Sequence, residues 1–342
     1  MKKKRTIYNI AKELKVSPGT VSKAINNTGN ISEKTRTKIL DYIKEVGYVP
    51  SSSARMLKST KSRTIGVIFS EELDIGLEHS FFASILQHFK SYVENKGYEL
   101  TFIVTKLGHN KLSYLEWCQN KKVDGVYIVV GDYHDQGIHE LIKGNIPVIS
   151  TDMILDGLHT VISDNDQSIY NLLNYIKDSL KKSKIGMVVG PQQSKAFELR
   201  YQAFLKYHQK LNISIKKHHI VYSEGFGFTS GYQAALSLLQ YKDDLPEVLF
   251  VSSDDISLGV IKALLEHNVN IPEDIQIIGF DDIPVAKYIT PALTTIAQDR
   301  KLLGLTAGEK LISLIENPNY QVPEVTYIPT KIIERNSTRK SK

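Results

Sequence analysis

The chain is poor in cysteine and has no long apolar run. Its 342 residues include a single cysteine, Cys118, so no disulfide can form within the chain, which is typical of a reducing compartment. No stretch approaches the roughly 20 apolar residues that a membrane-spanning helix needs. No apolar segment follows the basic residues 1–5, as it would in a secretory signal. We therefore expect a cytoplasmic protein with no membrane partner.

The sequence also lacks a catalytic or metal-binding constellation. No serine, histidine and acid can be assembled into a nucleophile and its base. The acidic pairs Asp254-Asp255 and Asp281-Asp282 have no histidine or cysteine at ligand spacing, and the segment 225–228 lacks the third glycine of a phosphate-binding loop. We expect no enzyme, no metal and no cofactor, and we interpret Cys118 as packed and His218-His219 as exposed.

What the chain does have is positive charge concentrated at one end. Residues 1–63 hold 15 lysines and arginines against four acidic residues, which gives this segment a charge of +11. The whole chain carries +6, so the remaining residues carry −5. A basic segment joined to a mildly acidic body predicts that the N-terminal end binds a polyanion, although a solvated basic tail would show the same balance.

The first fifty residues have the pattern of three short helices. Thr6 and Ser17 are of the residue types that cap helices, and Pro18 suits the first position of the second helix. Asn9 stands where an acid is commoner in a capping box, which predicts weak capping of the first helix. Ser32 can cap the third helix. Two tightly joined helices and a third are typical of a helix-turn-helix module, with a generic helical bundle as the alternative.

The residues of this segment resemble the LacI/GalR family of repressors. The likeness rests on four ordered blocks, TIYNIA at 6–11, VSPGTVSKAIN at 16–26, ISEKTR at 31–36 and GYVP at 47–50. It implies that the second helix enters the major groove, where Pro18 and Gly19 select bases by apolar contact and close approach and Lys23 donates to a guanine edge. The residues that the resemblance places at phosphates or base edges are Tyr8, Ser17, Thr20, Ser22, Asn26, Lys34 and Arg36.

The segment PSSSARMLK at residues 50–58 resembles the hinge helix of the same family. It is too short to hold a helix by itself in water, so the resemblance implies that it folds on DNA beside its twin from a second subunit. Ala54 and Leu57 then contact the operator, with Leu57 as the apolar wedge that enters a minor-groove base step. A plain polar linker is the alternative.

From Thr64 onward, short apolar runs alternate with stretches of helix length. We expect strands at 65–69, 100–104, 123–130, 147–149, 185–190, 219–221, 248–252 and 275–280. We expect helices at 81–96, 110–121, 166–180, 194–209, 229–241, 255–267 and 299–315. Runs that are apolar throughout predict parallel sheets covered on both faces. The similar openings TIGVI at 64–68 and KIGMV at 184–188 predict two lobes with a ligand cleft between them.

Several of these strands are followed by polar residues that resemble the effector domain of the family, which is itself similar to periplasmic sugar-binding proteins. The most specific blocks are VSSDD at 251–255, IGFDD at 278–282 and LTTIAQD at 293–299. The resemblance implies an effector cleft made by Asp152, Arg200, Ser253, Asp254 and Asp281. A guanidinium and carboxylates of this kind can hold a polyhydroxylated ligand. Ser253 stands where the family often has asparagine, which leaves the identity of the ligand open.

Two further points concern the same cleft. Phe81 and Phe82 follow the first strand, where one ring could stack on the face of a sugar, with ordinary core packing as the alternative for both. For Asp254 and Asp282 the alternative is helix capping or a salt bridge.

Together these features predict a small all-α helix-turn-helix head and a two-lobed α/β domain of the periplasmic-binding-protein type with parallel sheets. We place the head at 1–50, the hinge and linker at 51–63, the effector-binding and dimerisation domain at 64–335 and a tail at 336–342. We expect a homodimeric, nucleoid-associated bacterial repressor of transcription that binds double-stranded operator DNA under the control of a small-molecule effector. A sugar or sugar phosphate is the expected effector, and a purine is the other candidate. The rival functions are a sugar-binding protein whose head has lost operator specificity and an α/β enzyme acting on sugars or nucleotides.

Overall fold

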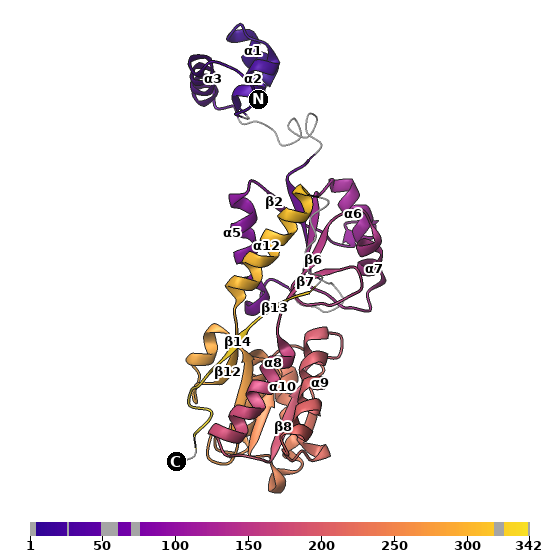
Figure 1. Cartoon of the computed structure of the whole chain (residues 1–342), viewed down its shortest axis with the longest axis vertical. Coiled ribbons are helices and arrows are strands. Elements are labelled where there is room, and N and C mark those ends of the chain that lie inside the picture. Colours follow the sequence, from indigo (N-terminus) through magenta and orange to yellow (C-terminus); the bar gives the residue numbers. More distant parts are fainter. Residues whose placement is uncertain (1–4, 26, 49–60, 70–75, 318–324, 341–342) are drawn as a thin grey trace. The chain divides into compact units, whose positions relative to one another are not determined.

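The structure is a computed structural model, and it describes residues 5–25, 27–48, 61–69, 76–317 and 325–340. The chain divides into two units, a head at Met1–Ser62 and a body at Arg63–Lys342, which are described separately (Figure 1).

The head is built from three helices around a small apolar core. The helices are α1 (Ile7–Glu13), α2 (Pro18–Ile25) and α3 (Glu33–Glu45). Their buried core residues are Ile10, Ala11, Val21, Ala24 and Ile39. Thr6 caps α1, and the Asn9 side chain accepts a hydrogen bond of 2.9 Å from the Thr6 backbone N–H. The expectation of weak capping was therefore wrong, because the amide oxygen of asparagine completes the capping box as a carboxylate would.

The body consists of two lobes, each with a six-stranded sheet. The first sheet has the order β13-β7-β6-β5-β1-β2, and every neighbouring pair is parallel. The second sheet has the order β14-β12-β11-β10-β8-β9, and it is parallel except for β14, which runs antiparallel to β12. Two-lobed parallel sheets therefore confirm the expected architecture.

The first lobe contains the strands β1 (Thr64–Phe69), β2 (Glu99–Phe102), β5 (Gly125–Val130), β6 (Val148–Ser150), β7 (His159–Ser163) and β13 (Val325–Ile328). Its helices are α5 (Ser80–Asn95), α6 (Tyr114–Lys121), α7 (Gln136–Lys143) and α12 (Arg300–Glu316), and a small hairpin pairs β3 (Lys106–Leu107) with β4 (Asn110–Lys111). Helices α5 and α12 lie side by side (Figure 1).

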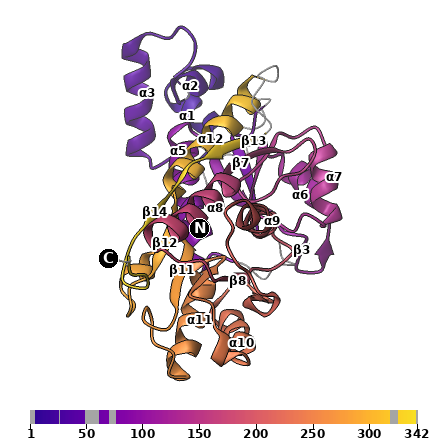
Figure 2. The same ribbon diagram turned by 60° about the horizontal axis from the view of Figure 1, so that its bottom comes forward.

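The second lobe contains the strands β8 (Ile185–Val189), β9 (Ile220–Tyr222), β10 (Val248–Val251), β11 (Gln276–Asp281), β12 (Thr294–Gln298) and β14 (Thr330–Ile333). Its helices are α8 (Asn165–Asn174), which continues as a π-helical turn at Tyr175–Ser179, α9 (Lys195–Lys210), α10 (Phe228–Leu239) and α11 (Asp254–Glu266). Helices α10 and α11 pack closely (Figure 2), since a Cβ atom added to Gly259 would lie 1.9 Å from the Phe228 carbonyl oxygen. No helix in the described ranges is both long and apolar enough to span a bilayer.

The described chain passes between the lobes at three places. It crosses from β7 to α8, from β12 to α12 and from β13 to β14. Helix α12 returns to the first lobe, where it packs on α5 and on strands β5 to β7. Each lobe is thus assembled from segments that are far apart in the sequence, and the three crossings connect the lobes.

Several elements differ from those expected. The strands β7, β12, β13 and β14 and the helix α7 were not predicted. The helix expected at 110–121 begins only at Tyr114, because Ser113 caps it and the residues before it belong to the hairpin. The expected tail is partly packed against the second lobe. The Ser337 hydroxyl donates to the Ile277 carbonyl at 2.6 Å, and Thr338 is buried beside Thr294, with their hydroxyls 2.7 Å apart.

Candidate DNA interface and effector cleft

The first turn of α2 brings together several of the expected DNA contacts. Ser17 precedes the helix, and its hydroxyl accepts a hydrogen bond of 3.0 Å from the Thr20 backbone N–H and lies 2.9 Å from the Thr20 hydroxyl. Pro18 begins the helix, where its missing N–H costs nothing. The Ser22 side chain is half-buried. The helix N-terminus also carries the partial positive charge that favours a phosphate.

The fold of the head has room for a side chain at position 19, where the sequence has glycine. A Cβ atom at this position would meet only the Ser17 hydroxyl oxygen within 4 Å, at an ordinary contact distance of 3.6 Å. Glycine is unfavourable inside a helix, so the head gains no stability from it. The geometry is consistent with close approach of DNA bases to this turn.

The remaining expected contacts of the head differ in their exposure. Tyr8 is 70 % exposed and Lys34 is also exposed. The exposed Lys23 packs its aliphatic stem near Gly29. Arg36 is directed differently, because its guanidinium is largely buried and Nε lies 3.4 Å from a Glu33 carboxylate oxygen. Asn26, Ala54 and Leu57, with the expected hinge helix, lie outside the described residues.

In the body, Arg200 on α9 is the centre of a buried polar cluster. The Arg200 side chain donates from Nε to Asn165 Oδ1 at 2.9 Å and from Nη1 to the Ser252 carbonyl at 2.6 Å. Its guanidinium stacks on the ring of Phe280 at 3.6 Å from the centroid, and Nη2 lies 4.0 Å from Asp281 Oδ1. Burial of the charge lowers the pKa of Arg200, while the nearby Asp281, Asp152 and Asp254 raise it. The structure therefore brings together Arg200, Asp152, Asp254 and Asp281, four of the seven expected cleft residues.

Asp152 and Asp281 have unusual acidities for carboxyl groups. Burial raises the pKa of Asp152 to about 7, against the lowering influence of Arg200, and the Asp281 charge raises it further. Burial likewise raises the pKa of Asp281 to about 7, while Arg200 and a 2.6 Å hydrogen bond from Gln298 lower it. Asp152 Oδ2 is buried and has no hydrogen-bond partner among the described residues. Such a carboxyl can accept a hydrogen bond from a ligand hydroxyl as it ionises.

The backbone at Asp281 is also strained. Asp281 ends β11 with φ of +120° and Asp282 follows with φ of +54°, conformations that residues with a Cβ atom rarely adopt. Strain of this kind persists where the surrounding structure enforces it, and it is concentrated at functional sites. Arg335 Nη2 lies 2.6 Å from Asp282 Oδ1. Asp282 therefore forms a salt bridge, which was the alternative to ligand binding for this residue.

Asp254 and the remaining expected cleft residues have structural partners. Asp254 is fully buried, and its two oxygens accept from the Thr295 hydroxyl at 2.7 Å and from the Ile283 backbone N–H at 2.9 Å. Ser253 caps α11 through the Ile256 N–H. Phe81 and Phe82 are both buried side chains of α5, as in ordinary core packing.

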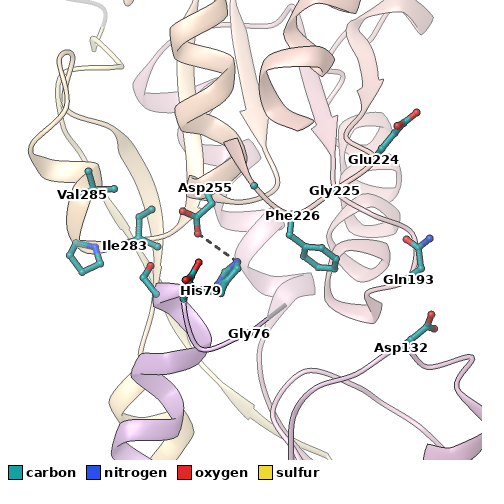
Figure 3. Close-up of a pocket in the computed structure, with 14 residues that line it drawn as sticks. Gly76, His79, Asp132, Gln193, Glu224, Gly225, Phe226, Asp255, Ile283 and Val285 are labelled. Carbon is teal, nitrogen blue, oxygen red and sulfur yellow. Dashed lines mark ion pairs between the residues drawn. The ribbon is translucent and has the colours of Figure 1, made fainter. Parts of the chain in front are cut away.

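A cavity of about 1250 Å³ lies between the two lobes (Figure 3). The first lobe lines it with residues such as His79 and Asp132, and the second with residues such as Gln193, Phe226 and Asp255. Figure 3 shows His79 and Asp255 facing each other across the lobes, with His79 Nε2 3.6 Å from Asp255 Oδ2.

The seven expected effector residues are not among the described residues that line this cavity. The buried cluster nevertheless adjoins it through two connections. Ile283 lines the cavity and donates its N–H to Asp254. The backbone of Gly131, next to the lining residue Asp132, hydrogen-bonds Asp152 and lowers its pKa.

Sequence reasoning missed two residues that hold the cluster. Asn165, the partner of Arg200, follows β7 at the first crossing, and Gln298, the partner of Asp281, ends β12 at the second. Both lie at the carboxyl ends of strands that were not predicted, so the rule that ligands gather at such ends was not applied there. Recognition of a strand in the block at 293–299 would have revealed Gln298.

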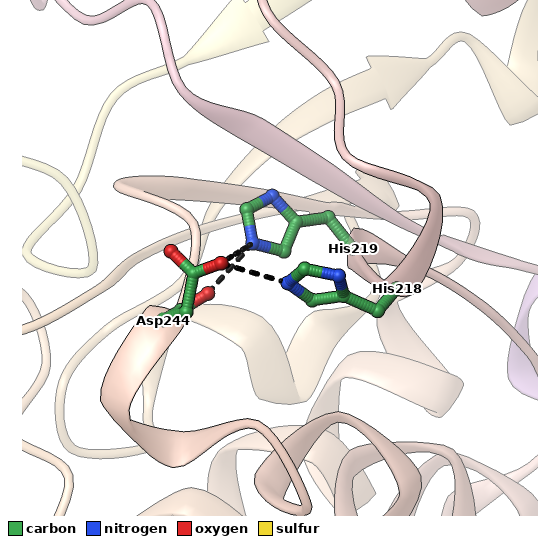
Figure 4. Close-up of side chains that lie close together, drawn as sticks. All are labelled: His218, His219 and Asp244. Carbon is green, nitrogen blue, oxygen red and sulfur yellow. Dashed lines mark hydrogen bonds and ion pairs between the residues drawn. The ribbon is translucent and has the colours of Figure 1, made fainter.

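A second polar cluster lies away from the cleft (Figure 4). His218 Nε2 lies 2.9 Å from Asp244 Oδ2, and His219 Nε2 lies 2.7 Å from the Asp244 backbone oxygen. His219 is fully buried, so the expectation of two exposed histidines was wrong for it. The 3₁₀ turn Lys217–His219 directs this ring inward before β9 begins. Lys184 and Lys216 each donate to Asp244, at 2.7 and 2.6 Å, and they hold the pKa of that carboxyl below its usual range. Because both carboxylate oxygens already accept from ammonium groups, the geometry favours an ion-pair network over a metal site.

Comparison with known proteins gives the class of the chain. Residues 6–51 match the family model of the bacterial regulatory proteins of the lacI family, and residues 179–338 match the model of the periplasmic binding protein-like domain. The HTH-type transcriptional repressor PurR of Proteus mirabilis (strain HI4320) is 32 % identical over 341 residues, which cover 97 % of this chain and 96 % of the relative. The ribose operon repressor of Haemophilus influenzae is 29 % identical, with 97 % of this chain and 98 % of the relative covered.

Solved structures agree with this class at the level of the fold. The Lac repressor dimer bound to operator and the anti-inducer ONPF superimposes with a TM-score of 0.82 at 24 % identity, covering 98 % of this chain and 99 % of that one. Fold and sequence together define a DNA-binding transcriptional regulator with a small-molecule effector domain, and not an enzyme. The chain belongs to the lacI family of bacterial regulatory proteins, as the resemblance implied.

Proposed function

We propose that the chain is a cytoplasmic homodimeric repressor whose operator affinity is set by a sugar or sugar derivative bound between the lobes of the body. In this proposal the head is the DNA-binding domain, residues 51–63 form the hinge, and the two lobes provide effector binding and dimerisation. The observation that carries the proposal is the buried Arg200, which has two acidic carboxyls beside it and a direct hydrogen bond to a lobe crossing. A palindromic operator matches a twofold dimer.

The contacts of this cluster supply a route from ligand to lobe movement. Arg200 is bonded to Asn165 at the first crossing, and Asp281 is bonded to Gln298 at the second. A ligand whose hydroxyl groups compete for these hydrogen bonds changes the contacts that hold the crossings. Different lobe orientations then present the two hinge segments of a dimer at different spacings. A coupling free energy between effector and operator is typically about 1–3 kcal/mol.

The experiment combines operator binding with a ligand screen. Footprinting and fluorescence anisotropy on the promoter DNA beside its own gene should reveal a protected palindrome. A thermal-shift panel of sugars, sugar phosphates and purines identifies the effector, because a ligand that binds only the native state raises the melting temperature. Sequence-independent binding that is abolished by moderate salt would favour the rival sugar-binding protein, and absence of a protected palindrome under any ligand would refute the regulator mechanism.

Arg200 variants test the assignment of the cleft. Arg200→Ala and the charge-conserving Arg200→Lys should both abolish the effector response and keep basal operator affinity. Lys keeps the charge but cannot make both hydrogen bonds of the guanidinium. Lys210→Ala, an exposed change on the same helix, is the matched control. Circular dichroism checks that the variants fold, and a normal effector response in the folded Lys variant would place the effector elsewhere.

A further inference from the structure

The cavity between the lobes has acidic walls on both sides. The lining residues Glu78 and Asp132 come from the first lobe, and Glu224 and Asp255 come from the second. Figure 3 labels Asp132, Glu224 and Asp255 among them. Among the described residues that line the cavity, none is lysine or arginine. A ligand in this space therefore meets carboxylates from two directions.

The one imidazole among the described lining residues does not balance this charge. His79 faces Asp255 at 3.6 Å, and burial lowers the pKa of His79 more than Asp255 raises it. A histidine whose pKa lies below its ordinary value of about 6.5 is mostly neutral at pH 7. The acidic side chains of the cavity thus have no cationic counterpart in the lining that is described.

Two of the cations next to the cavity, Arg200 and Lys195, are already paired. Arg200 donates to Asn165 and to the Ser252 carbonyl and lies beside Asp281. Lys195, two residues after the lining residue Gln193, is paired with Glu198 at 2.7 Å. Arg300 lowers the pKa of Asp281 by its charge, although its buried Nη1 has no hydrogen-bond partner among the described residues. None of these three cations is among the described residues that line the cavity, so the described lining itself keeps an excess of negative charge.

Space does not limit the ligand in the same way. A volume of about 1250 Å³ exceeds the roughly 300–1,000 Å³ of ordinary small-molecule pockets, so a phosphate group would fit sterically. Charge distinguishes anionic from uncharged ligands in this cavity. A phosphate monoester carries about −1.5 to −2 at neutral pH and would lose its hydration among carboxylates. Uncharged hydroxyls can donate to the same carboxylates, and an amine would be attracted by them.

We propose that the effector is a hydroxylated compound that is uncharged or carries an amine, and that phosphorylated and carboxylated sugars are excluded from this cleft by its charge. The proposal rests on the proposed function, in which this cleft is the effector site. It narrows the expected effector by removing sugar phosphates.

The test uses the full chain and sets of sugars that differ in one group. Glucose, glucosamine, glucose 6-phosphate and glucuronate form one set, and ribose with ribose 5-phosphate, galactose with galacturonate, and fructose with its phosphates extend it. Calorimetric titration at low salt should show each anionic member binding at least about tenfold more weakly than its uncharged parent, which corresponds to about 1.4 kcal/mol. The ratio should shrink in high salt, because screening weakens charge repulsion and leaves steric exclusion unchanged. An anionic member that binds as tightly as its parent overturns the proposal, and so does a panel in which no uncharged or amine-bearing member binds.

Variants of the walls add a second readout. The double variant Asp132→Asn with Glu224→Gln should bind a sugar phosphate more nearly as tightly as its uncharged parent sugar. The ratio of the two dissociation constants should therefore be smaller than in the wild type. The amide oxygen introduced by Asp132→Asn can still accept the 2.8 Å hydrogen bond that Asp132 receives from the His134 N–H, so the loop is kept. Glu140→Gln, an exposed change on α7 away from the lining, is the control and should leave the ratio unchanged. An unchanged ratio in the double variant overturns the role of these walls. Uncharged sugars that bind without changing operator affinity would instead refute the proposed function and leave the selectivity of the cavity standing.

Discussion

Asp152→Asn should stabilise the protein at neutral and alkaline pH and have little effect in acid. The Asp152 carboxyl has an ordinary pKa near 3.9 in the unfolded chain, and burial raises it to about 7 in the folded state. The folded state therefore binds this proton more tightly, and the free energy of unfolding falls as pH rises from about 4 to about 7. Three pKa units correspond to about 4 kcal/mol, of which about 2 kcal/mol fall between pH 5 and pH 7.

Asparagine has no proton to lose, so the variant escapes this decline. Urea unfolding of the full chain, followed by circular dichroism at several values between pH 5 and pH 8, should show the advantage of the variant growing with pH by up to about 3 kcal/mol. Asp281 titrates in the same range in both proteins and adds a pH dependence of its own, which the interaction of the two carboxyls makes slightly different in the variant. Asp156→Asn, an exposed change in the same loop, is the control. An equal difference between variant and wild type at pH 5 and pH 8 would refute the reasoning.

Three further variants test the head, the hinge and the packing of the second lobe. Gly19→Ala should leave the head as stable as before, or stabilise it by roughly 0.5 kcal/mol, and weaken operator binding in anisotropy; unchanged operator affinity would contradict close approach at this turn. Leu57→Ala should weaken specific operator binding and spare effector affinity measured by calorimetry; an unaltered operator affinity removes the wedge role. Gly259→Ala should destabilise the body by about 1–3 kcal/mol or more, because the new methyl group would lie 1.9 Å from the Phe228 carbonyl; a melting temperature like that of Gly19→Ala would show that α10 moves away freely.

The elements that sequence reasoning located are those with an unambiguous period. Strands such as Ile185–Val189 and Val248–Val251 are short, apolar throughout and covered on both faces, and they were predicted to within a residue or two. The three helices of the head were located from their caps for the same reason: a capping residue followed by apolar positions three and four apart has few other interpretations.

The missed strands contain polar residues in the middle of the sheet. β7 (His159–Ser163) and β12 (Thr294–Gln298) carry threonines that are fully or nearly fully buried, such as Thr160 and Thr295. In β12 the hydroxyls are satisfied by long-range partners, Asp254 for Thr295 and Thr338 for Thr294. A local sequence pattern does not reveal hydrogen-bond partners that are so far away along the chain. The polar residues were therefore interpreted as loops.

The candidate site was predictable only in its buried part. Arg200, Asp152 and Asp281 were identified from the family resemblance, and the structure places them together. The cavity lining could not be predicted in this way, because His79, Glu224 and Ile283 lie in loops or at helix ends of different lobes. The tertiary fold alone brings those residues to one space.

The triple crossing of the chain has a consequence for how the protein is made. Both six-stranded sheets receive their last strand from residues 325–333, as β13 and β14. On the ribosome, where domains ordinarily fold as soon as they emerge, neither lobe can be completed until residues 325–333 have been translated. A premature stop codon shortly before residue 325 would therefore damage both halves of the sensor at once, while the head, which is translated before both lobes, would already have folded.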